Sequence, residues 1–227
     1  YSFLKTNPYV SNSVKREFAD ILDKYTLSEL ASKSLFWLLN IDPIVSSPRP
    51  ILPHAAYIGG QAIAEAKPLK KDLQEYFDSA KEGVIVVSFG SLQTNLPKVI
   101  AQKLLSTFEK VPQRVLWKFK NPHNQTIPDN VKLMDWIPQR DMLVHPKTRL
   151  FITHCGNNGR YEAIYSGVPM LGFPIFGDQK FNCAEVKWKG LGETLLLATF
   201  TVDDLIYNIG KVVWIFKLPK DSLRYFL

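Results

Sequence analysis

Downstream of Gly83 the chain alternates between short apolar runs and longer amphipathic stretches. The run from Val84 to Ser88 is rich in β-branched residues, which is typical of a strand buried on both faces of a sheet. Predicted strands cover residues 84–88, 115–119, 131–136, 150–153, 169–173 and 194–197. Predicted helices cover 97–110, 139–144, a stretch that ends at Gly167, 178–189, and a last helix that begins at Thr201 with Asp204 supporting its first turn. This alternation predicts an α/β fold with a doubly wound parallel sheet.

The first 82 residues follow a less regular pattern. Apolar residues recur at helical spacing from Arg16 to about Leu39, and Thr26 with Glu29 forms a capping box that opens a second helix. Residues 36–39 predict a buried run, either a helix end or a strand. Four prolines then favour extended chain, and a short strand over 56–58 ends at two glycines. One amphipathic helix follows, with a buried face marked by Leu73, Tyr76, Phe77 and Ala80.

Composition narrows the classes of function. Of the 227 residues, 46% are hydrophobic and 22% charged, as in ordinary globular proteins. The net charge of +7 is scattered, without an arginine-rich arm, zinc-finger spacing or RNA-binding aromatic motif, so we expect no nucleic-acid partner. Cys155 and Cys183 are too few for a zinc site, and the sequence leaves open whether they form a disulfide. Asn124-Gln125-Thr126 is a glycosylation sequon, meaningful only in the secretory pathway. No apolar run reaches the roughly 18 residues of a membrane span.

Candidate chemistry gathers where the predicted strands end. In doubly wound sheets the ligand lies beyond the carboxyl ends of the strands, which directs attention to residues 90–91, 136–139 and 154–159. The last of these segments follows a buried strand and opens a helix, whose N-terminus presents unpaired N–H groups and a partial positive charge. It is therefore a candidate site for an anion.

Single residues in that segment fit a nucleotide. Gly156 and Gly159 let the backbone approach a phosphate closely, and His154 and Asn158 add side-chain donors. Glu162 lies one turn further on, where its carboxylate can accept hydrogen bonds from ribose hydroxyls. The alternative is a glycine-rich turn beside a hydrogen-bonded core histidine, since short glycine motifs often occur without a ligand.

Two further clusters are ambiguous when each is taken alone. Trp136, fixed by the following Ile137-Pro138, can offer a flat face to a nucleobase, and Gln139 can read the base edge or the ribose; the alternative is a tryptophan packed in the core. Asp178 and Gln179 combine a carboxylate and an amide suited to sugar hydroxyls. The alternative for Asp178 is a helix N-cap.

The order and spacing of these clusters are more specific than any one of them. From Trp136 to Gln179 the sequence resembles the signature region of the family-1 UDP-glycosyltransferases, especially the animal UDP-glucuronosyltransferase-like branch. The resemblance is carried by GVIVVSFGS, DWIPQRDMLVHPKTRLFITHCGNNG and YEAIYSGVPMLGFPIFGDQ. SSPRPILPHAAYIGG looks like the family's crossing between its two domains. The resemblance covers about Ser34 to Val213.

The resemblance implies a GT-B glycosyltransferase fold, in which two Rossmann-like sheets face each other across a cleft. The chain then divides into a remnant of the N-terminal acceptor domain (1–60), an interdomain linker (61–82) and the C-terminal UDP-sugar-binding domain (83–227). The implied donor contacts are uracil and nucleoside at Trp136, Ile137 and Gln139, diphosphate at Ser91, His154, Gly156, Asn158 and Gly159, ribose at Glu162, and the transferred sugar at Asp178 and Gln179.

Three positions depart from the family's usual pattern. Cys155 stands where animal members have glycine, and Lys180 replaces a proline. Lys118 stands where many relatives carry arginine, which keeps the charge and loses the bidentate geometry. We expect the backbone path at Cys155 to be preserved, because plant members commonly have cysteine there.

The resemblance also sets expectations for the reaction. A glucuronosyl or hexosyl group would pass with inversion from UDP-glucuronate or a UDP-hexose to a small lipophilic acceptor, with no metal and no cofactor beyond the UDP-sugar co-substrate. The catalytic base would be a histidine of the N-terminal acceptor domain; His54, His123 and His145 are not assigned this role, so no catalytic residue is expected in this chain. The whole protein would be anchored in the endoplasmic reticulum membrane by a C-terminal span absent here, with its domains in the lumen.

Two other functions compete with this one. The chain alone, without turnover, would be a truncated UDP-sugar-binding or regulatory module that pairs with full-length partners, and the resemblance leaves open a homo- or hetero-oligomer. A nicotinamide-dependent oxidoreductase would need GxGxxG after the first strand, where this chain has SFGSLQT.

Overall fold

The structure is a computed structural model that describes residues 27–43, 45–47, 49–61, 63–91 and 96–215. The contacts divide the chain into two compact units. One comprises the described part of Tyr1–Leu39 together with Arg49–Ile58, and the other comprises Asn40–Pro48 with Gly59–Leu227, again as far as they are described. The predicted domain limits at residues 60 and 82 concern a longer protein and stay a prediction.

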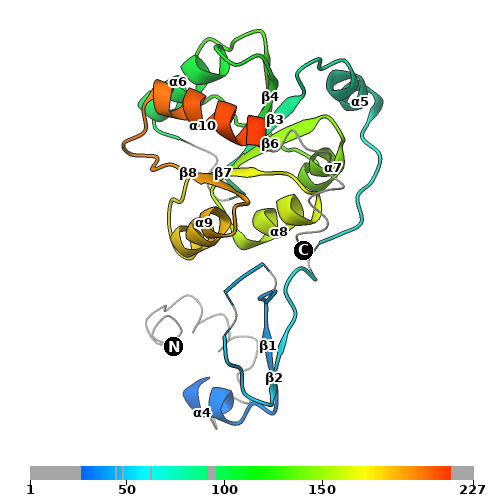
Figure 1. The fold of residues 1–227 in the computed structure, drawn as a ribbon, viewed down its shortest axis with the longest axis vertical. Coiled ribbons are helices and arrows are strands. Elements are labelled where there is room, and N and C mark those ends of the chain that lie inside the picture. Colours follow the sequence, from blue (N-terminus) through cyan, green and yellow to red (C-terminus); the bar gives the residue numbers. More distant parts are fainter. Residues whose placement is uncertain (1–26, 44, 48, 62, 92–95, 216–227) are drawn as a thin grey trace. The chain divides into compact units, whose positions relative to one another are not determined.

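The larger unit is built on a six-stranded sheet in which every neighbouring pair is parallel (Figure 1). Its strands in chain order are β3 (Val84–Ser88), β4 (Arg114–Lys118), β5 (Val131–Met134), β6 (Thr148–Thr153), β7 (Met170–Gly172) and β8 (Gly192–Thr194). The spatial order is β5-β4-β3-β6-β7-β8. The first strand therefore lies in the middle, and the chain builds outward in one direction and then in the other.

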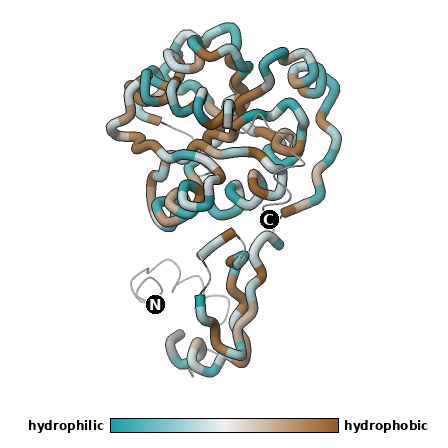
Figure 2. The backbone as a smooth tube through the Cα atoms, in the orientation of Figure 1, coloured by the Kyte–Doolittle hydropathy of each residue, from teal (hydrophilic) through white to brown (hydrophobic). Residues whose placement is uncertain are grey.

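Helices cover both faces of this sheet (Figure 1). The helices are α5 (Lys71–Asp78), α6 (Lys98–Phe108), α7 (Gln139–Val144), α8 (Asn157–Tyr165), α9 (Gln179–Trp188) and α10 (Val202–Ile215). Buried side chains of α6 and α10 pack on one face with Ile85 and Val87, whereas those of α5, α7, α8 and α9 pack on the other with Val84 and Val86. Alternate residues of a strand point to opposite faces, so the four residues of β3 from Val84 to Val87 must all be apolar. The central strands are accordingly among the hydrophobic parts of the tube in Figure 2.

These observations confirm the predicted fold class, an α/β protein with a doubly wound parallel sheet. The chain reverses its direction of sheet growth between β3 and β6, which are hydrogen-bonded neighbours. In such sheets a crevice forms at this switch point, beyond the carboxyl ends of the two strands. The loops after Ser88 and Thr153 are therefore expected to border a ligand site.

The smaller unit contains α4 (Leu27–Ser32) and a parallel pair, β1 (Trp37–Leu39) and β2 (Ala55–Tyr57). The prediction that residues 36–39 are buried is wrong, because Phe36 is 53% and Leu38 65% exposed. Within the described part of this unit, two paired three-residue strands form too small a sheet to bury their apolar side chains, which stay at the surface. Thr26 and the predicted helix upstream of it lie outside the described residues.

Most predicted elements of the larger unit are present within a few residues of their expected ends. The last predicted strand, 194–197, is wrong in position, because β8 spans Gly192–Thr194. Gly192 pairs with Met170, and a side chain at Gly192 would collide with the Met170 backbone. Close packing of two backbones thus sets where the strand runs, while Leu195 and Leu197 pack against the core from the segment that follows.

Candidate functional site

A cavity of about 450 Å³ lies beyond the carboxyl ends of β3, β4 and β6. Nine of the predicted donor contacts line it: Ser91, Trp136, Ile137, Gln139, His154, Gly156, Asn158, Gly159 and Glu162. The other lining residues are Ser88, Gly90, Lys118, Phe151, Thr153 and Asn157. Residues from four separate loops and helices thus meet at the switch point of the sheet, as the rule for doubly wound folds requires.

His154 occupies the floor of this cavity, directly after β6. Its Nε2 atom fits between two glycines: an added Cβ would lie 2.8 Å from Nε2 at Gly90 and 2.5 Å from it at Gly156. Its Nδ1 atom is buried and has no hydrogen-bond partner among the described residues. The alternative of a core histidine with both nitrogens hydrogen-bonded is therefore not met among the described residues, although the Ser88 backbone still acts on the ring.

Burial lowers the pKa of His154. The Ser88 backbone and the Asp178 carboxylate act in the opposite direction, and the Lys118 ammonium adds to the lowering. Desolvation penalises the imidazolium form, so the ring is neutral near pH 7. In a neutral imidazole one nitrogen carries a proton and can donate a hydrogen bond, while the other nitrogen can accept a hydrogen bond. The ring can therefore donate one hydrogen bond into the cavity without carrying a charge.

The N-terminus of α8 opens onto the same space. Gly156 is the N-cap, with φ −61° and ψ 143°, and no side chain caps the helix. The first intrahelical hydrogen bond of this turn runs from the Arg160 N–H to the Gly156 carbonyl, so the N–H groups of Asn157, Asn158 and Gly159 come before the helical hydrogen bonds begin. An uncapped helix start beside a histidine is suited to an anion.

An exposed aromatic ring also lines the cavity. Trp136 is 69% exposed, which rules out the alternative of a tryptophan packed in the core. The Nζ atom of Lys118 lies 3.9 Å from the centre of its ring, in a cation–π contact, and donates a hydrogen bond to the Gly90 carbonyl at 3.2 Å. Burial lowers the pKa of Lys118. Lys118 ends β4, so the rule that directed attention to strand ends would have found it.

Gln139 and Glu162 form a polar pair on the cavity wall. Gln139 Nε2 donates to Glu162 Oε2 at 2.6 Å, and both residues line the cavity. The pair joins the start of α7 to α8 and fixes the carboxylate, whose other oxygen has no hydrogen-bond partner in the described part of the chain and can accept from a ligand. Two residues predicted separately to contact one nucleoside therefore lie side by side.

Asp178 and Gln179 are not among the residues that line this cavity. Gln179 is 4% exposed, and its Oε1 accepts hydrogen bonds from the Ile175 and Phe176 N–H groups, so it shapes the turn before α9. Asp178 is the N-cap residue of α9 by position, but it makes no side-chain cap and instead accepts from Asn182 Nδ2 at 2.8 Å. Its charge still acts on His154. Their predicted contact with the transferred sugar stays a prediction.

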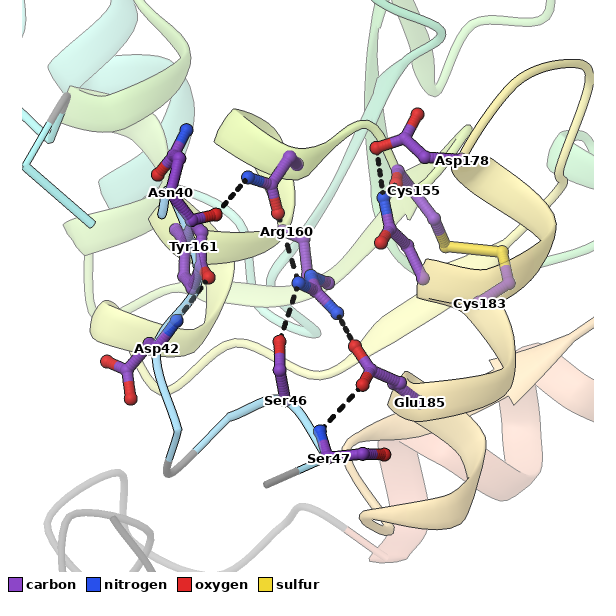
Figure 3. Close-up of polar contacts among 12 residues, drawn as sticks. Asn40, Asp42, Ser46, Ser47, Cys155, Arg160, Tyr161, Asp178, Cys183 and Glu185 are labelled. Atoms are coloured by element: carbon purple, nitrogen blue, oxygen red, sulfur yellow. Dashed lines mark hydrogen bonds and ion pairs between the residues drawn. A yellow bond between two sulfur atoms is a disulfide. The ribbon is translucent and has the colours of Figure 1, made fainter. Parts of the chain in front are cut away.

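A second polar network lies on the other side of α8, and the sequence did not point to it (Figure 3). Arg160 donates to Glu185 of α9 at 2.5 Å, to Ser46 at 3.2 Å and to Asn157 at 3.0 Å. Glu185 also accepts from the Ser47 N–H at 2.7 Å. This network fastens the part of segment 40–47 that carries Ser46 and Ser47 to α8, which lines the cavity, and to α9.

The remaining histidines lie elsewhere. His54, His123 and His145 are not among the lining residues. His123 contacts the Leu96 carbonyl, and His145 contacts Gln74 and Asp78. The assignment of the base to the N-terminal acceptor domain stays a prediction.

The described residues contain neither a group of metal ligands nor a membrane-spanning helix. Within residues 27–215, apart from the gaps given above, no three His, Cys, Asp or Glu side chains are grouped to hold a metal ion. In the same part of the chain no helix combines the length and the apolar character that crossing a membrane demands.

Comparison with known proteins identifies the relatives of this chain. The family model described as UDP-glucoronosyl and UDP-glucosyl transferase matches residues 6–215. UDP-glucuronosyltransferase 2A3 of Cavia porcellus is 44% identical over 189 residues, which cover 83% of this chain and 36% of that protein. UDP-glucuronosyltransferase 2A2 of Homo sapiens is 44% identical, with 83% of this chain and 35% of that protein covered.

Solved structures agree on the fold. The glycotransferase of kitacinnamycin superposes with a TM-score of 0.70 at 21% identity, over 99% of this chain and 59% of that one. Os79 from O. sativa, in complex with UDP, superposes with a TM-score of 0.59 at 22% identity, over 67% of this chain and 36% of that one. The chain spans little more than a third of the length of the two curated relatives above. Since the family model covers residues 6–215, the chain belongs to the UDP-glycosyltransferase family.

Proposed function

We propose that this chain forms the UDP-sugar-binding part of a glycosyltransferase that moves a glucuronosyl or hexosyl group to a small lipophilic acceptor. The observation that carries the proposal is the cavity at the switch point of the sheet, where nine residues expected from the family pattern line one space. A doubly wound sheet with a ligand crevice at this place is common to many functions, so the side chains and not the fold carry the argument.

The nucleoside would lie against Trp136. An exposed indole offers a face on which uracil can stack, and the Lys118 ammonium on that ring would either sandwich the base or be displaced by it. The free oxygen of Glu162 would accept hydrogen bonds from the ribose hydroxyls, with Gln139 holding the carboxylate in place. The Ile137 backbone would read the edge of the base.

The diphosphate would lie between His154 and the first turn of α8. The N–H groups of that turn and the neutral His154 ring would donate to phosphate oxygens, with Asn158 and Ser91 at the rim. Lys118 supplies a positive charge at the same cavity. Such donors matter most when the bond to the sugar breaks, because negative charge then develops on the departing UDP.

The sugar would extend from the diphosphate toward the start of α9. The Asp178 carboxylate offsets part of the lowering that burial imposes on the pKa of His154, so its charge acts at the ring, which supports a sugar contact at Asp178 next to the phosphates. The acceptor oxygen would attack the anomeric carbon from the side opposite UDP, so that the configuration inverts. The base that deprotonates the acceptor would come from the N-terminal acceptor domain, and we propose that the reaction needs no metal.

We also propose that the whole protein works in the lumen of the endoplasmic reticulum, anchored to the membrane. The Cys155–Cys183 disulfide supports an oxidising compartment. Asn124 and Thr126 of the sequon are exposed and Gln125 between them is buried, so the acceptor asparagine is accessible. In cells, removal of a glycan from Asn124 would appear as a shift in electrophoretic mobility that Asn124→Gln abolishes.

The first test is UDP binding to this chain by calorimetry, for the wild type, Trp136→Ala and His154→Ala. We expect saturable binding that each substitution weakens by about tenfold or more, the loss of roughly 1.4 kcal/mol or more that one stacking or charge-assisted contact supplies. Trp188→Ala is the matched control, because Trp188 is equally exposed but lies at the end of α9, away from the lining residues.

The outcomes separate the site from the fold. If Trp136→Ala and His154→Ala weaken binding and Trp188→Ala does not, the donor site is where we place it. If a folded wild type, judged by its circular dichroism, fails to bind UDP, the proposed function is wrong for this chain.

A further inference from the structure

A covalent bond joins the loop beneath the cavity to a neighbouring helix (Figure 3). Cys155 directly follows His154 in the loop between β6 and α8, and Cys183 lies in α9. Their Cα atoms are 5.6 Å apart and their sulfur atoms are bonded. Both residues are buried. Neither cysteine touches the nucleoside end of the cavity, so this bond is not explained by the site described above.

The surroundings of the bond fit it closely. Gly172, on β7 between the two cysteines, leaves the space that the sulfur atoms fill, because an added Cβ there would collide with both of them. Asn182, the neighbour of Cys183, donates a hydrogen bond from Nδ2 to the Cys155 carbonyl at 3.0 Å. The loop is therefore tied to α9 twice, through its backbone and through the sulfur of Cys155.

The same residue holds an uncommon backbone conformation. Cys155 has φ 60°, in the left-handed region that residues other than glycine seldom adopt. Its neighbours are His154, whose ring fits between two glycines, and Gly156, the N-cap of α8. A relaxation of the backbone at Cys155 would move both groups that face the phosphates, and an external restraint on this residue prevents it.

We propose that the Cys155–Cys183 disulfide is a positioning crosslink for diphosphate binding: it holds the loop so that His154 and the start of α8 converge on one anion. This inference rests on the proposed function, since the anion is the diphosphate of the UDP-sugar. Trp136 and Gln139 belong to other segments, and Glu162 lies further along α8, where Gln139 holds its carboxylate, so the crosslink acts mainly on the diphosphate end of the cavity.

Breaking the bond has a defined chemistry. A dithiol reagent such as dithiothreitol attacks one sulfur through its thiolate, and its second thiol then closes the reagent's own disulfide. Two electrons and two protons pass to the protein, which is left with two thiols, while the reagent is oxidised. Because both cysteines are buried, the substitution Cys183→Ala breaks the link more cleanly than reduction does.

The bond itself is tested first. Trypsin cuts after Arg149 and Arg160 and after Lys180 and Lys187, so the unreduced wild type should yield residues 150–160 joined to 181–187. The joined pair should separate on reduction when followed by mass spectrometry. Two unlinked peptides with free thiols in the unreduced sample would overturn the proposal.

Its role is tested by comparing two ligands. For Cys155→Ala, Cys183→Ala and the double variant, we expect the UDP dissociation constant to rise about tenfold and that of uridine to change less than about twofold. The three losses should be equal, because each variant removes the same single bond and the effects do not add. Val186→Ala is the control: it removes buried volume from the same helix without touching the link, and should leave UDP affinity unchanged.

The remaining outcomes separate this proposal from the function on which it rests. Cys183→Ala with the UDP affinity of the wild type overturns the positioning role alone. Equal losses for UDP and uridine also overturn it, because they indicate general loosening of the domain. A wild type that binds no UDP overturns the proposed function and the positioning role together, while the joined peptides still report on the bond.

Discussion

The two sides of helix α8 use polar groups in opposite ways. On the side of segment 40–47, Arg160 and Glu185 are 3% and 4% exposed and are paired with each other, with Ser46 and Ser47 around them. On the side of the cavity, the helix start is uncapped and the Nδ1 atom of His154 has no partner among the described residues. On one side α8 thus carries a buried ion pair, in which the Arg160 Nε atom lacks a hydrogen-bond partner among the described residues, and on the other side it presents an uncapped start beside His154.

This difference separates what stabilises the fold from what binds a ligand. A buried ion pair with additional hydrogen bonds is costly to break, because removing one partner leaves the other charged and buried. A buried donor or acceptor without a partner lowers stability instead, and it persists where a ligand completes it. We therefore expect substitutions on the two sides to affect different measurements.

The largest effect is expected from Arg160→Met, which keeps much of the side-chain volume and removes the charge. It leaves Glu185 buried without its cation, and we expect the free energy of unfolding to fall by about 3–5 kcal/mol. Urea denaturation followed by circular dichroism measures it. The UDP affinity of the fraction that remains folded should change by less than about threefold, or roughly 0.6 kcal/mol.

The double variant Arg160→Met with Glu185→Gln is the control for this prediction. It removes both charges, so a large part of the lost stability should return, since most of the cost of the single variant lies in the orphaned carboxylate. A single Arg160→Met variant as stable as the wild type would contradict the assignment of this network as the anchor of segment 40–47.

A smaller effect, and on affinity, is expected on the cavity side from Glu162→Gln. A hydrogen bond to a charged acceptor contributes about 1.5–3 kcal/mol, so UDP should bind roughly 10- to 150-fold more weakly. The wild type should prefer UDP to 2′-deoxy-UDP, and the variant should lose much of that preference. Glu109→Gln, at the end of α6, is the matched control. If Glu162→Gln kept the wild-type preference for UDP over 2′-deoxy-UDP, Glu162 would not contact the ribose.

Local patterns explain how much of the fold the sequence predicts. A β-branched run such as Val84–Ser88 and helical spacing of apolar residues are properties of neighbours in the chain, so the order of six strands and the helices between them could be predicted. The position of β8 could not. Leu195 and Leu197 signal burial, which a loop also provides, and the approach of the Gly192 and Met170 backbones is known only in three dimensions.

The candidate site divides in the same way. The rule that ligands lie beyond strand ends, together with the order of the motifs, predicted Trp136 and His154, which both line the cavity. The same rule applied to the end of β4 would have added Lys118. Arg160 could not be singled out in this way, because its ionic partner Glu185 is 25 residues away in the sequence and Ser46 is 114 residues away. Tertiary packing brings such ionic partners together, and the side chain of a single arginine on a helix is most often exposed to solvent.

The smallest effect concerns pH and tests the unfilled side of α8 directly. Burial lowers the pKa of His154 below its ordinary value of 6.5. As the pH falls below about 6.5, His154 becomes protonated in the unfolded chain but stays neutral in the folded chain. The free energy of unfolding therefore decreases, by at most about 1.4 kcal/mol per pH unit from this residue. Above that pH neither state is protonated and the contribution vanishes.

Urea denaturation between pH 7.5 and 5.5 tests this contribution. The free energy of unfolding should fall less steeply with decreasing pH for His154→Gln than for the wild type. Other titrating groups affect both proteins alike, so their effect cancels when the two curves are subtracted. Parallel curves would mean that His154 is as free to take up a proton as in the unfolded chain, and that the cavity does not keep its ring neutral.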